Sequence, residues 1–203
     1  MYDRKRVKFE AKQSLNANFG IALGTIIVAG LIMSAAAAFT FSIATIVLSG
    51  VIEVGLAIVM LNIVRGHEVN FAQMFNGFEN FGTTCLAGVL TGLYTLLWTM
   101  LFIIPGIVKA YSYSMTFYIL ADNPDMKPNE AIKASCQMMK GHKFDLFVLH
   151  LSFFWWNLLG SVTFGIAYIY VVPYMSAAEA KFYDTIKNEY FANTHSAEYS
   201  QQI

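Results

Sequence analysis

The chain has 203 residues, of which 57% are hydrophobic and only 13% are charged, whereas a soluble domain carries about 25% charged residues. Its basic and acidic residues balance, so net charge indicates neither nucleic acid nor an acidic partner. Long stretches carry no charge at all, which is typical of chains that cross a bilayer. We therefore expect an all-α polytopic membrane helix bundle, formed by 1–203 as a single domain, with no nucleic-acid partner.

The first expected element is a short amphipathic helix that lies on the membrane surface. Val7, Ala11 and Leu15 follow one another at intervals of four residues, so they share one face of a helix. The basic residues Arg4, Lys8 and Lys12 form a second face in the same way. A helix with these two faces lies in the membrane interface and does not span the bilayer.

Residues 19–64 form an almost unbroken apolar run, in which Glu53 is the only charged residue. The run is roughly twice as long as one transmembrane helix of about 20 residues. We divide it near residues 38–42, which gives predicted spans at 19–38 and 42–64.

A second surface helix is expected after Asn70, a residue type that suits a helix N-cap. Its predicted apolar face consists of Phe71, Met74, Phe75 and Phe78. A third span is predicted at 84–104. Pro105 and Gly106 then predict a tight turn, because proline and glycine interrupt helices, and a shorter fourth span follows at 107–121.

A third surface helix is expected to begin at Pro128, with an apolar face formed by Ile132, Cys136 and Met139. The fifth span is predicted at 144–159 and the sixth from 163. The sixth contains Pro173, which removes one backbone donor and predicts a kink. The predicted bundle thus has about six transmembrane helices in three hairpins, each preceded by a short amphipathic surface helix.

Twelve of the thirteen lysines and arginines precede the first span, lie in connectors on the same side or follow the sixth span. Only Lys109 breaks this rule. Positive charge is enriched on the cytoplasmic side, so both termini are predicted to be cytoplasmic. The regular spacing of the three connectors suggests a three-fold repeat over 1–64, 70–121 and 128–187. The alternative is that any protein with three hairpins needs three such connectors.

Ionisable residues within predicted spans are the candidate functional residues. Glu53 is a candidate partner for Lys109, with Tyr111 and Tyr113 as further neighbours. Alternatively, Lys109 extends toward the membrane surface and Glu53 is protonated or hydrogen-bonded inside the bundle. A second polar pair is predicted between His150 and Glu179, as a structural bond in preference to a proton-transfer site.

No catalytic, nucleotide-binding or metal-ligand motif is present in the sequence, so we predict no enzyme, no cofactor and no metal. The leading hypothesis is a protein that acts through membrane lipids at the cytoplasmic leaflet, or through other membrane proteins or a second copy of itself. One alternative is a small transporter or channel with a polar cavity around Glu53. Another is a receptor or immunity factor for a membrane-active peptide.

Several short motifs resemble a family of uncharacterised bacterial integral membrane proteins (domain of unknown function 975). They are IIPGIVKA at 103–110, YILADNP at 118–124 and EAIKAS at 130–135, together with Pro173, Tyr174, Phe182 and Tyr183. The resemblance extends over nearly the whole chain. It implies a membrane fold and a bacterial plasma membrane location, and it brings no activity or site residue with it.

Overall fold

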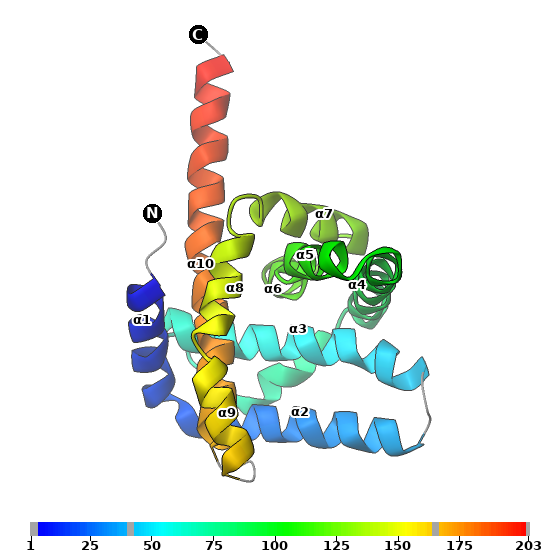
Figure 1. Ribbon diagram of the computed structural model, residues 1–203, viewed down its shortest axis with the longest axis vertical. Coiled ribbons are helices and arrows are strands. Elements are labelled where there is room, and N and C mark those ends of the chain that lie inside the picture. The colour runs from blue at the N-terminus through cyan, green and yellow to red at the C-terminus, as the bar shows by residue number, and fades with distance from the viewer. Residues whose placement is uncertain (1–3, 40–42, 164–166, 202–203) are drawn as a thin grey trace.

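The computed structural model describes residues 4–39, 43–163 and 167–201, without the side chains of 35–39, 43–47, 159, 162 and 191–201 (Figure 1). Within these ranges the elements are helices and no strand occurs, which confirms the all-α class. In chain order they are α1 (Arg4–Ala17), α2 (Phe19–Phe39), α3 (Ile43–Arg65), the 3-10 helix η1 (Phe71–Phe78), α4 (Phe81–Leu101), α5 (Ile103–Tyr113), α6 (Thr116–Asp122), α7 (Pro128–Met138), α8 (Lys143–Leu151), α9 (Phe154–Val162) and α10 (Tyr168–Gln201).

The central helix of the molecule is α3, which packs against α1, α2, η1, α4, α6 and α10. Its closest backbone contact is with η1. A Cβ added at Gly55 would overlap the carbonyl oxygen of Met74, and a Cβ added at Gly77 would overlap that of Val51. Glycine at both positions therefore lets the two backbones touch, as small residues do where membrane helices cross.

Three helical hairpins extend in three different directions (Figure 1). In that view α2 and α3 lie across the picture, α8, α9 and α10 run vertically, and α4 and α6 are seen nearly end-on. The surface elements pack on these hairpins in a cyclic pattern: η1 on α3, α7 on α4 and α6, and α1 on α10. This pattern is the one expected of three equivalent units. The repeat itself stays a prediction.

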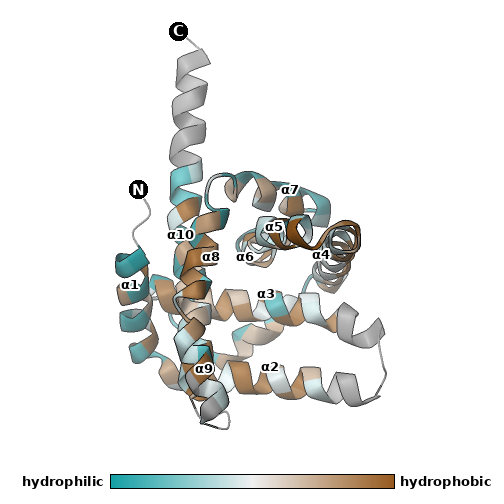
Figure 2. Ribbon diagram, viewed as in Figure 1, coloured by the Kyte–Doolittle hydropathy of each residue, from teal (hydrophilic) through white to brown (hydrophobic). Residues whose placement is uncertain are grey.

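Two described helices are long and apolar enough to cross a membrane, Leu48–Arg65 within α3 and Phe81–Leu101 as α4. A third is reached only if α1 and the described part of α2, which meet at 91°, count as one span. The six-span bundle is therefore not confirmed. Figure 2 shows the contrast between the apolar surface of α4 and the hydrophilic surface of α1. The predicted division near 38–42 falls partly on residues 40–42, which lie outside the described residues.

The predicted fourth span is broken because a side chain of α7 enters its hydrogen-bond ladder. The break separates α5 from α6. There the N–H of Met115 donates to Ser135 Oγ over 3.2 Å, and Ser135 Oγ donates to the carbonyl of Ser112 over 2.8 Å. A side chain inserted between backbone donor and acceptor interrupts the helix, so one predicted span becomes two short helices.

The predicted fifth span is also broken, into α8 and α9. At the break the Ser152 hydroxyl donates to the carbonyl of Leu149 over 2.5 Å and accepts from Lys8 Nζ over 3.1 Å. Phe153 is fully buried beside it. Each half is shorter than the roughly 20 residues that a span requires. By contrast, α10 continues unbroken from its start past Pro173, which is buried.

The turn predicted at Pro105 and Gly106 lies a few residues too late in the sequence. The chain reverses at Phe102, whose backbone is extended with φ −155° and ψ 132°, and α5 begins at the next residue. Pro105 lies in the first turn of α5, where its missing N–H is not needed. Gly106 is buried against α4, and a Cβ there would overlap the Thr99 side chain.

The second surface element is a 3-10 helix and not an α-helix, which divides its predicted apolar face. Asn70 caps it as expected. Because a 3-10 helix has three residues per turn, Met74 and Gly77 share the buried face, whereas Phe75 and Phe78 lie on an exposed one. The α-helical period predicted one apolar face for Met74, Phe75 and Phe78, whereas in the structure Met74 lies on a different face from the two phenylalanines.

Candidate functional site

A charged cluster, here called the hub, joins the C-terminal ends of α3 and α6 to the middle of α10. It consists of Arg65, Asp122, Tyr183, Asp184 and Lys187. The Arg65 guanidinium donates two hydrogen bonds to Asp122, of 2.6 and 2.9 Å, and reaches Asp184 at 2.6 Å. Lys187 Nζ and the Tyr183 hydroxyl donate to the same Asp122 oxygen, over 2.6 and 3.0 Å. Two cations and two carboxylates balance one another in this cluster.

Asp122, the carboxyl at the centre of the hub, is ionised at neutral pH. Burial alone would raise the pKa of Asp122, whose side chain is 11% exposed, but the hydrogen bonds from Arg65 and Lys187 lower that pKa to about 2. Burial and the neighbouring Asp122 carboxylate raise the pKa of Tyr183, so its hydroxyl keeps the proton that it donates. The hydrogen bonds of Asp122 therefore tie α6 to both α3 and α10.

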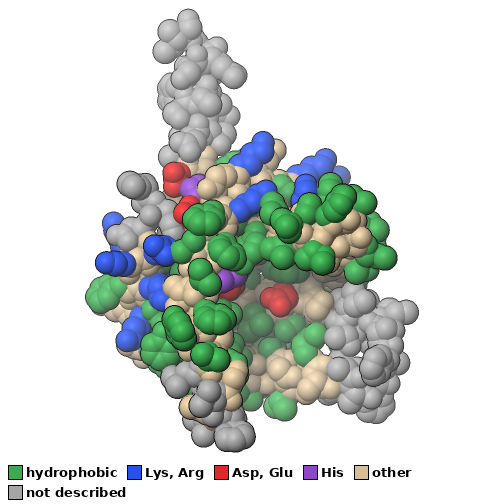
Figure 3. Space-filling model, viewed as in Figure 1, with side chains coloured by type: hydrophobic (Ala, Val, Ile, Leu, Met, Phe, Trp, Pro, Cys, Tyr) green, Lys and Arg blue, Asp and Glu red, His purple; other side chains and the backbone are tan. Residues whose placement is uncertain are grey.

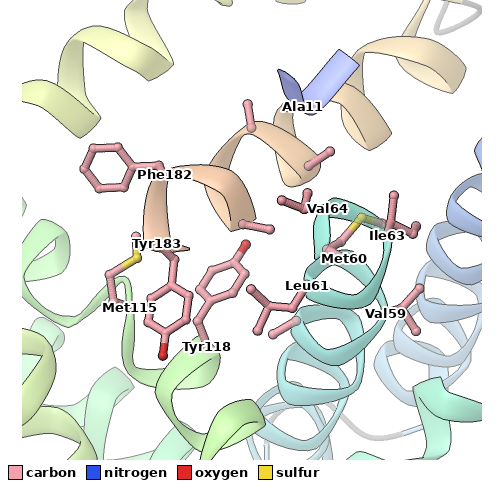
Figure 4. Packing of buried hydrophobic residues seen from close by; sticks show 14 of the residues in the cluster. Ala11, Val59, Met60, Leu61, Ile63, Val64, Met115, Tyr118, Phe182 and Tyr183 are labelled. Atoms are coloured by element: carbon pink, nitrogen blue, oxygen red, sulfur yellow. The ribbon is translucent and has the colours of Figure 1, made fainter. Parts of the chain in front are cut away.

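One helical turn before the charged residues of the hub, the three helices meet through the side chains of Leu61, Tyr118 and Tyr183 (Figure 4). The two tyrosine rings stack with their centroids 5.5 Å apart. Each of the three residues lies four positions, about one helical turn, before a charged residue of the hub: Arg65, Asp122 and Lys187. The three helices therefore approach one another in the same register.

A second group of polar side chains, here called the inner cluster, consists of Glu53, Tyr111, Tyr118, His150 and Glu179. The structure brings together the pair expected from the sequence, with His150 Nε2 2.9 Å from Glu179 Oε1. The Tyr111 hydroxyl lies 3.4 Å from His150 Nδ1. The hydroxyl of Tyr118 is hydrogen-bonded to Glu179, and Glu53 lies close enough to Glu179 to repel it electrostatically.

Glu53 is exposed on α3, although its immediate neighbours on that helix are buried. Its carboxylate makes no hydrogen bond and no ion pair with another described side chain. Figure 3 shows acidic and histidine side chains inside a hollow that hydrophobic side chains surround. Glu53 is exposed, and the side chains of His150 and Glu179 are 33% and 25% exposed, so the inner cluster is not a sealed core.

Lys109 is not paired with Glu53. Its Nζ lies 4.8 Å from the centre of the Trp98 ring, and it lines a groove beside α7 together with Tyr94, Tyr113 and Lys133. Tyr113 is hydrogen-bonded to Trp98. Of the two tyrosines proposed as neighbours of Glu53, only Tyr111 belongs to the inner cluster.

The two surface α-helices bury the residues that their periodicity places on one face. In α1, Val7, Ala11 and Leu15 are buried, and in α7, Ile132 is buried, as is Met139 just beyond its end, while Cys136 is partly buried. Lys8 does not share an open basic face, because its Nζ lies 4.2 Å from the centre of the Phe153 ring. These helices are therefore attached to the hairpins through their apolar faces.

The hub could not be predicted from the sequence, because its residues lie far apart in the chain. Each of them resembles the other charged residues of the polar segments between predicted spans. The one available signal was the shared four-residue spacing from a large side chain to a charge. Among the described residues, no group of three or more His, Cys, Asp or Glu side chains is placed to hold a metal ion.

No curated protein and no solved structure matches the chain. A family model does match it, at residues 1–112 and 101–190, which together cover nearly the whole sequence. That family is described as a protein of unknown function (DUF975), in agreement with the resemblance noted from the motifs. The chain belongs to this family.

Proposed function

We propose that this protein is a multi-pass protein of the bacterial plasma membrane, with both termini in the cytoplasm, that acts without catalysis through lipids or other membrane proteins at the cytoplasmic leaflet. The observation that carries this proposal is the direct contact between basic surface helices and outward-facing apolar helices.

The apolar surface is widest on α4 and α5. Only 17% of α4 is buried inside the molecule, and side chains such as Leu97, Leu101 and Ile104 are more than half exposed. Exposed apolar surface of this extent marks a membrane or protein contact, since a soluble monomer rarely exposes so much. Acyl chains are the natural covering for a helix of this length and composition.

The basic surface lies on α1 and α7. Arg4 and Lys12 on α1 and Lys133 on α7 are exposed, and so is Lys140 just beyond its end. Figure 3 shows basic side chains over α7 next to hydrophobic ones over α4 and α5. A lysine or arginine near an anionic membrane surface contributes about 1 kcal/mol of binding, so these helices favour a leaflet rich in anionic lipid.

The proposal is tested by thermal unfolding of the full chain in nanodiscs of phosphatidylglycerol or of phosphatidylcholine. We expect a higher midpoint in phosphatidylglycerol, and we expect the difference to shrink between low and high salt, because salt screens exposed charges. Equal midpoints in the two lipids at low salt would refute the proposal.

A transport function is the second candidate, and the exposed carboxylate of Glu53 beside Glu179 and His150 favours it. A polar group that faces a hollow within the membrane is a common feature of ion pathways. The test is proton flux into proteoliposomes that enclose a pH-sensitive dye, under an imposed membrane potential. Transport predicts that Glu53→Gln abolishes the flux and that Glu79→Gln, on the exposed surface, leaves it intact. An equal flux with and without Glu53 would exclude this candidate.

A further inference from the structure

The groove between α4, α5 and α7 is lined by aromatic and basic side chains. It has a volume of about 510 Å³, and Tyr94, Trp98, Tyr113, Lys109 and Lys133 contribute to its wall. The described residues that line it include no aspartate or glutamate. This combination differs from the inner cluster, where the carboxylates are in excess.

The lysines at the groove lack neutralising partners within the described part of the chain. Neither Lys109 nor Lys133 forms an ion pair with a described carboxylate. Lys143 adds to the same positive field, because both it and Lys109 act electrostatically on Cys136, another residue of the groove. Two lysines line the cavity, a third acts on one of its residues, and no described lining residue is a carboxylate. This charge distribution favours an anionic occupant.

An apolar path leads away from these cations. On α4, Tyr94, Trp98 and Leu101 follow at intervals of four and three residues, so they lie on one face of the helix. Beyond Trp98, Leu101 and Phe102 are 62% and 65% exposed. A ligand that fits both surfaces has an anionic head and a long hydrocarbon chain.

We propose that this groove binds the phosphate group of an anionic phospholipid, with Lys109 and Lys133 as its cationic partners and the acyl chain along Leu101 and Phe102. This inference rests on the proposed function at the cytoplasmic leaflet, and adds to it the ligand class and the site. It also accounts for the position of Lys109. The residue that breaks the charge rule in the sequence lies in the same groove as a lysine of α7.

The ring of Trp98 places Lys109 in the groove. A lysine over an aromatic face is attracted by the negative potential of the ring, and here the Nζ lies 4.8 Å from the ring centre. Tyr113 lines the groove beside the indole and limits the space into which it can turn. The lysine is thus oriented by its neighbours before a lipid arrives, which lowers the entropy lost on binding.

The test uses Trp98 as a local reporter of the lipid that contacts it. The chain has three tryptophans, so Trp155→Phe and Trp156→Phe leave Trp98 as the sole emitter. The full-length protein is placed in nanodiscs of phosphatidylglycerol and phosphatidylcholine, with brominated chains on one lipid at a time. We expect brominated phosphatidylglycerol to quench Trp98 more strongly than brominated phosphatidylcholine at the same mole fraction.

Removing both groove lysines should remove this preference. Each lysine near an anionic group contributes about five-fold in lipid partitioning, so Lys109→Gln with Lys133→Gln lowers the preference roughly 25-fold. The matched control is Lys127→Gln with Lys140→Gln, which removes the same number of charges from positions that do not line the groove. Lys109→Arg with Lys133→Arg keeps the charge and should keep the preference, which shows that loss in the glutamine variant is not misfolding.

The outcomes separate the site from the function. If both glutamine pairs lose the preference equally, the basic surface acts as a whole and the groove is not the site, while the proposed function survives. If phosphatidylglycerol fails to stabilise the protein in the unfolding experiment, the proposed function fails as well. If inorganic phosphate alone reverses the quenching by brominated phosphatidylglycerol, the groove binds free phosphate and the lipid assignment is overturned.

Discussion

Replacing Arg65 with methionine should destabilise the protein more than any other change of a single charged residue in the hub. The guanidinium contacts two carboxylates, Asp122 and Asp184, which are 11% and 18% exposed. Arg65→Met keeps a long side chain but leaves both carboxylates short of their main partner. Removing one partner of a buried ion pair costs about 3–5 kcal/mol. Since Arg65 itself is 25% exposed, we expect a value near the lower end, about 3 kcal/mol.

The same change should alter the dependence of stability on pH. A carboxyl whose pKa falls from 3.8 to about 2 on folding contributes roughly 2.5 kcal/mol at neutral pH. Because the folded pKa is the lower one, this contribution is present above pH 4 and is lost as the pH falls toward 2. In Arg65→Met the folded pKa of Asp122 rises, since burial opposes ionisation. The loss of stability between pH 4 and pH 2 should therefore be smaller in the variant.

The free energy of unfolding is measured by titrating the protein with sodium dodecyl sulfate in mixed micelles and following the helical circular dichroism signal. The matched control is Arg6→Met, because Arg6 is bonded to Glu10 with a side chain that is 77% exposed. Exposed pairs contribute about 0–1 kcal/mol. A loss below about 1 kcal/mol in Arg65→Met, or an unchanged acid dependence, would show that the hub does not hold the three helices together.

Two further predictions follow from the packing, and a third follows from the predicted orientation in the membrane. Ser135→Ala should lower the free energy of unfolding by about 1–3 kcal/mol in the same assay, because a buried backbone N–H and a buried carbonyl lose their partner. The control Ser114→Ala should lower it by about a few tenths of a kcal/mol. Similar losses in the two variants would refute the role of Ser135. Gly55→Ala should prevent folding through its clash with η1, whereas Gly24→Ala, which meets no atom within 4 Å, should be neutral or stabilising. With the two native cysteines replaced by serine, cysteines at 40 and 162 should react with an impermeant thiol reagent outside intact cells. One at 127 should not, and its reaction would overturn the predicted orientation.

The helical class and the apolar faces of α1 and α7 could be predicted because they depend on local periodicity. The broken spans could not, since each break depends on a residue from elsewhere in the chain. Ser135 reaches the gap between α5 and α6 from α7, and Lys8 reaches Ser152 from the first helix. An apolar run has the same composition whether or not a distant side chain interrupts it. Hydropathy therefore predicts where spans are possible and not where they are continuous.

The candidate sites show the same division between local and distant information. His150 and Glu179 were paired by their expected depth on neighbouring helices, which depends mainly on helix rise. The partner of Glu53 could not be found in this way, because depth fixes one coordinate and leaves the rotation of each helix open. Lys109 turns toward Trp98 on the preceding helix, whereas Glu53 turns toward Glu179. A rotation about the helix axis thus decides which polar groups meet.

The hub gives a physical reason why a three-fold repeat would be faint in the sequence. In three equivalent units, the residues near the axis would occupy equivalent positions, and Leu61, Tyr118 and Tyr183 lie together where α3, α6 and α10 meet. One turn later these helices carry Arg65, Asp122 and Lys187. Three identical charges there would repel one another in a partly buried site, so equivalent positions must carry different charges. Asp184, which accepts a hydrogen bond from Arg65, supplies the second carboxylate that balances the two cations. In a three-fold arrangement, the equivalent positions of the three units lie nearest one another at the axis. Identical residues would therefore be least tolerated there.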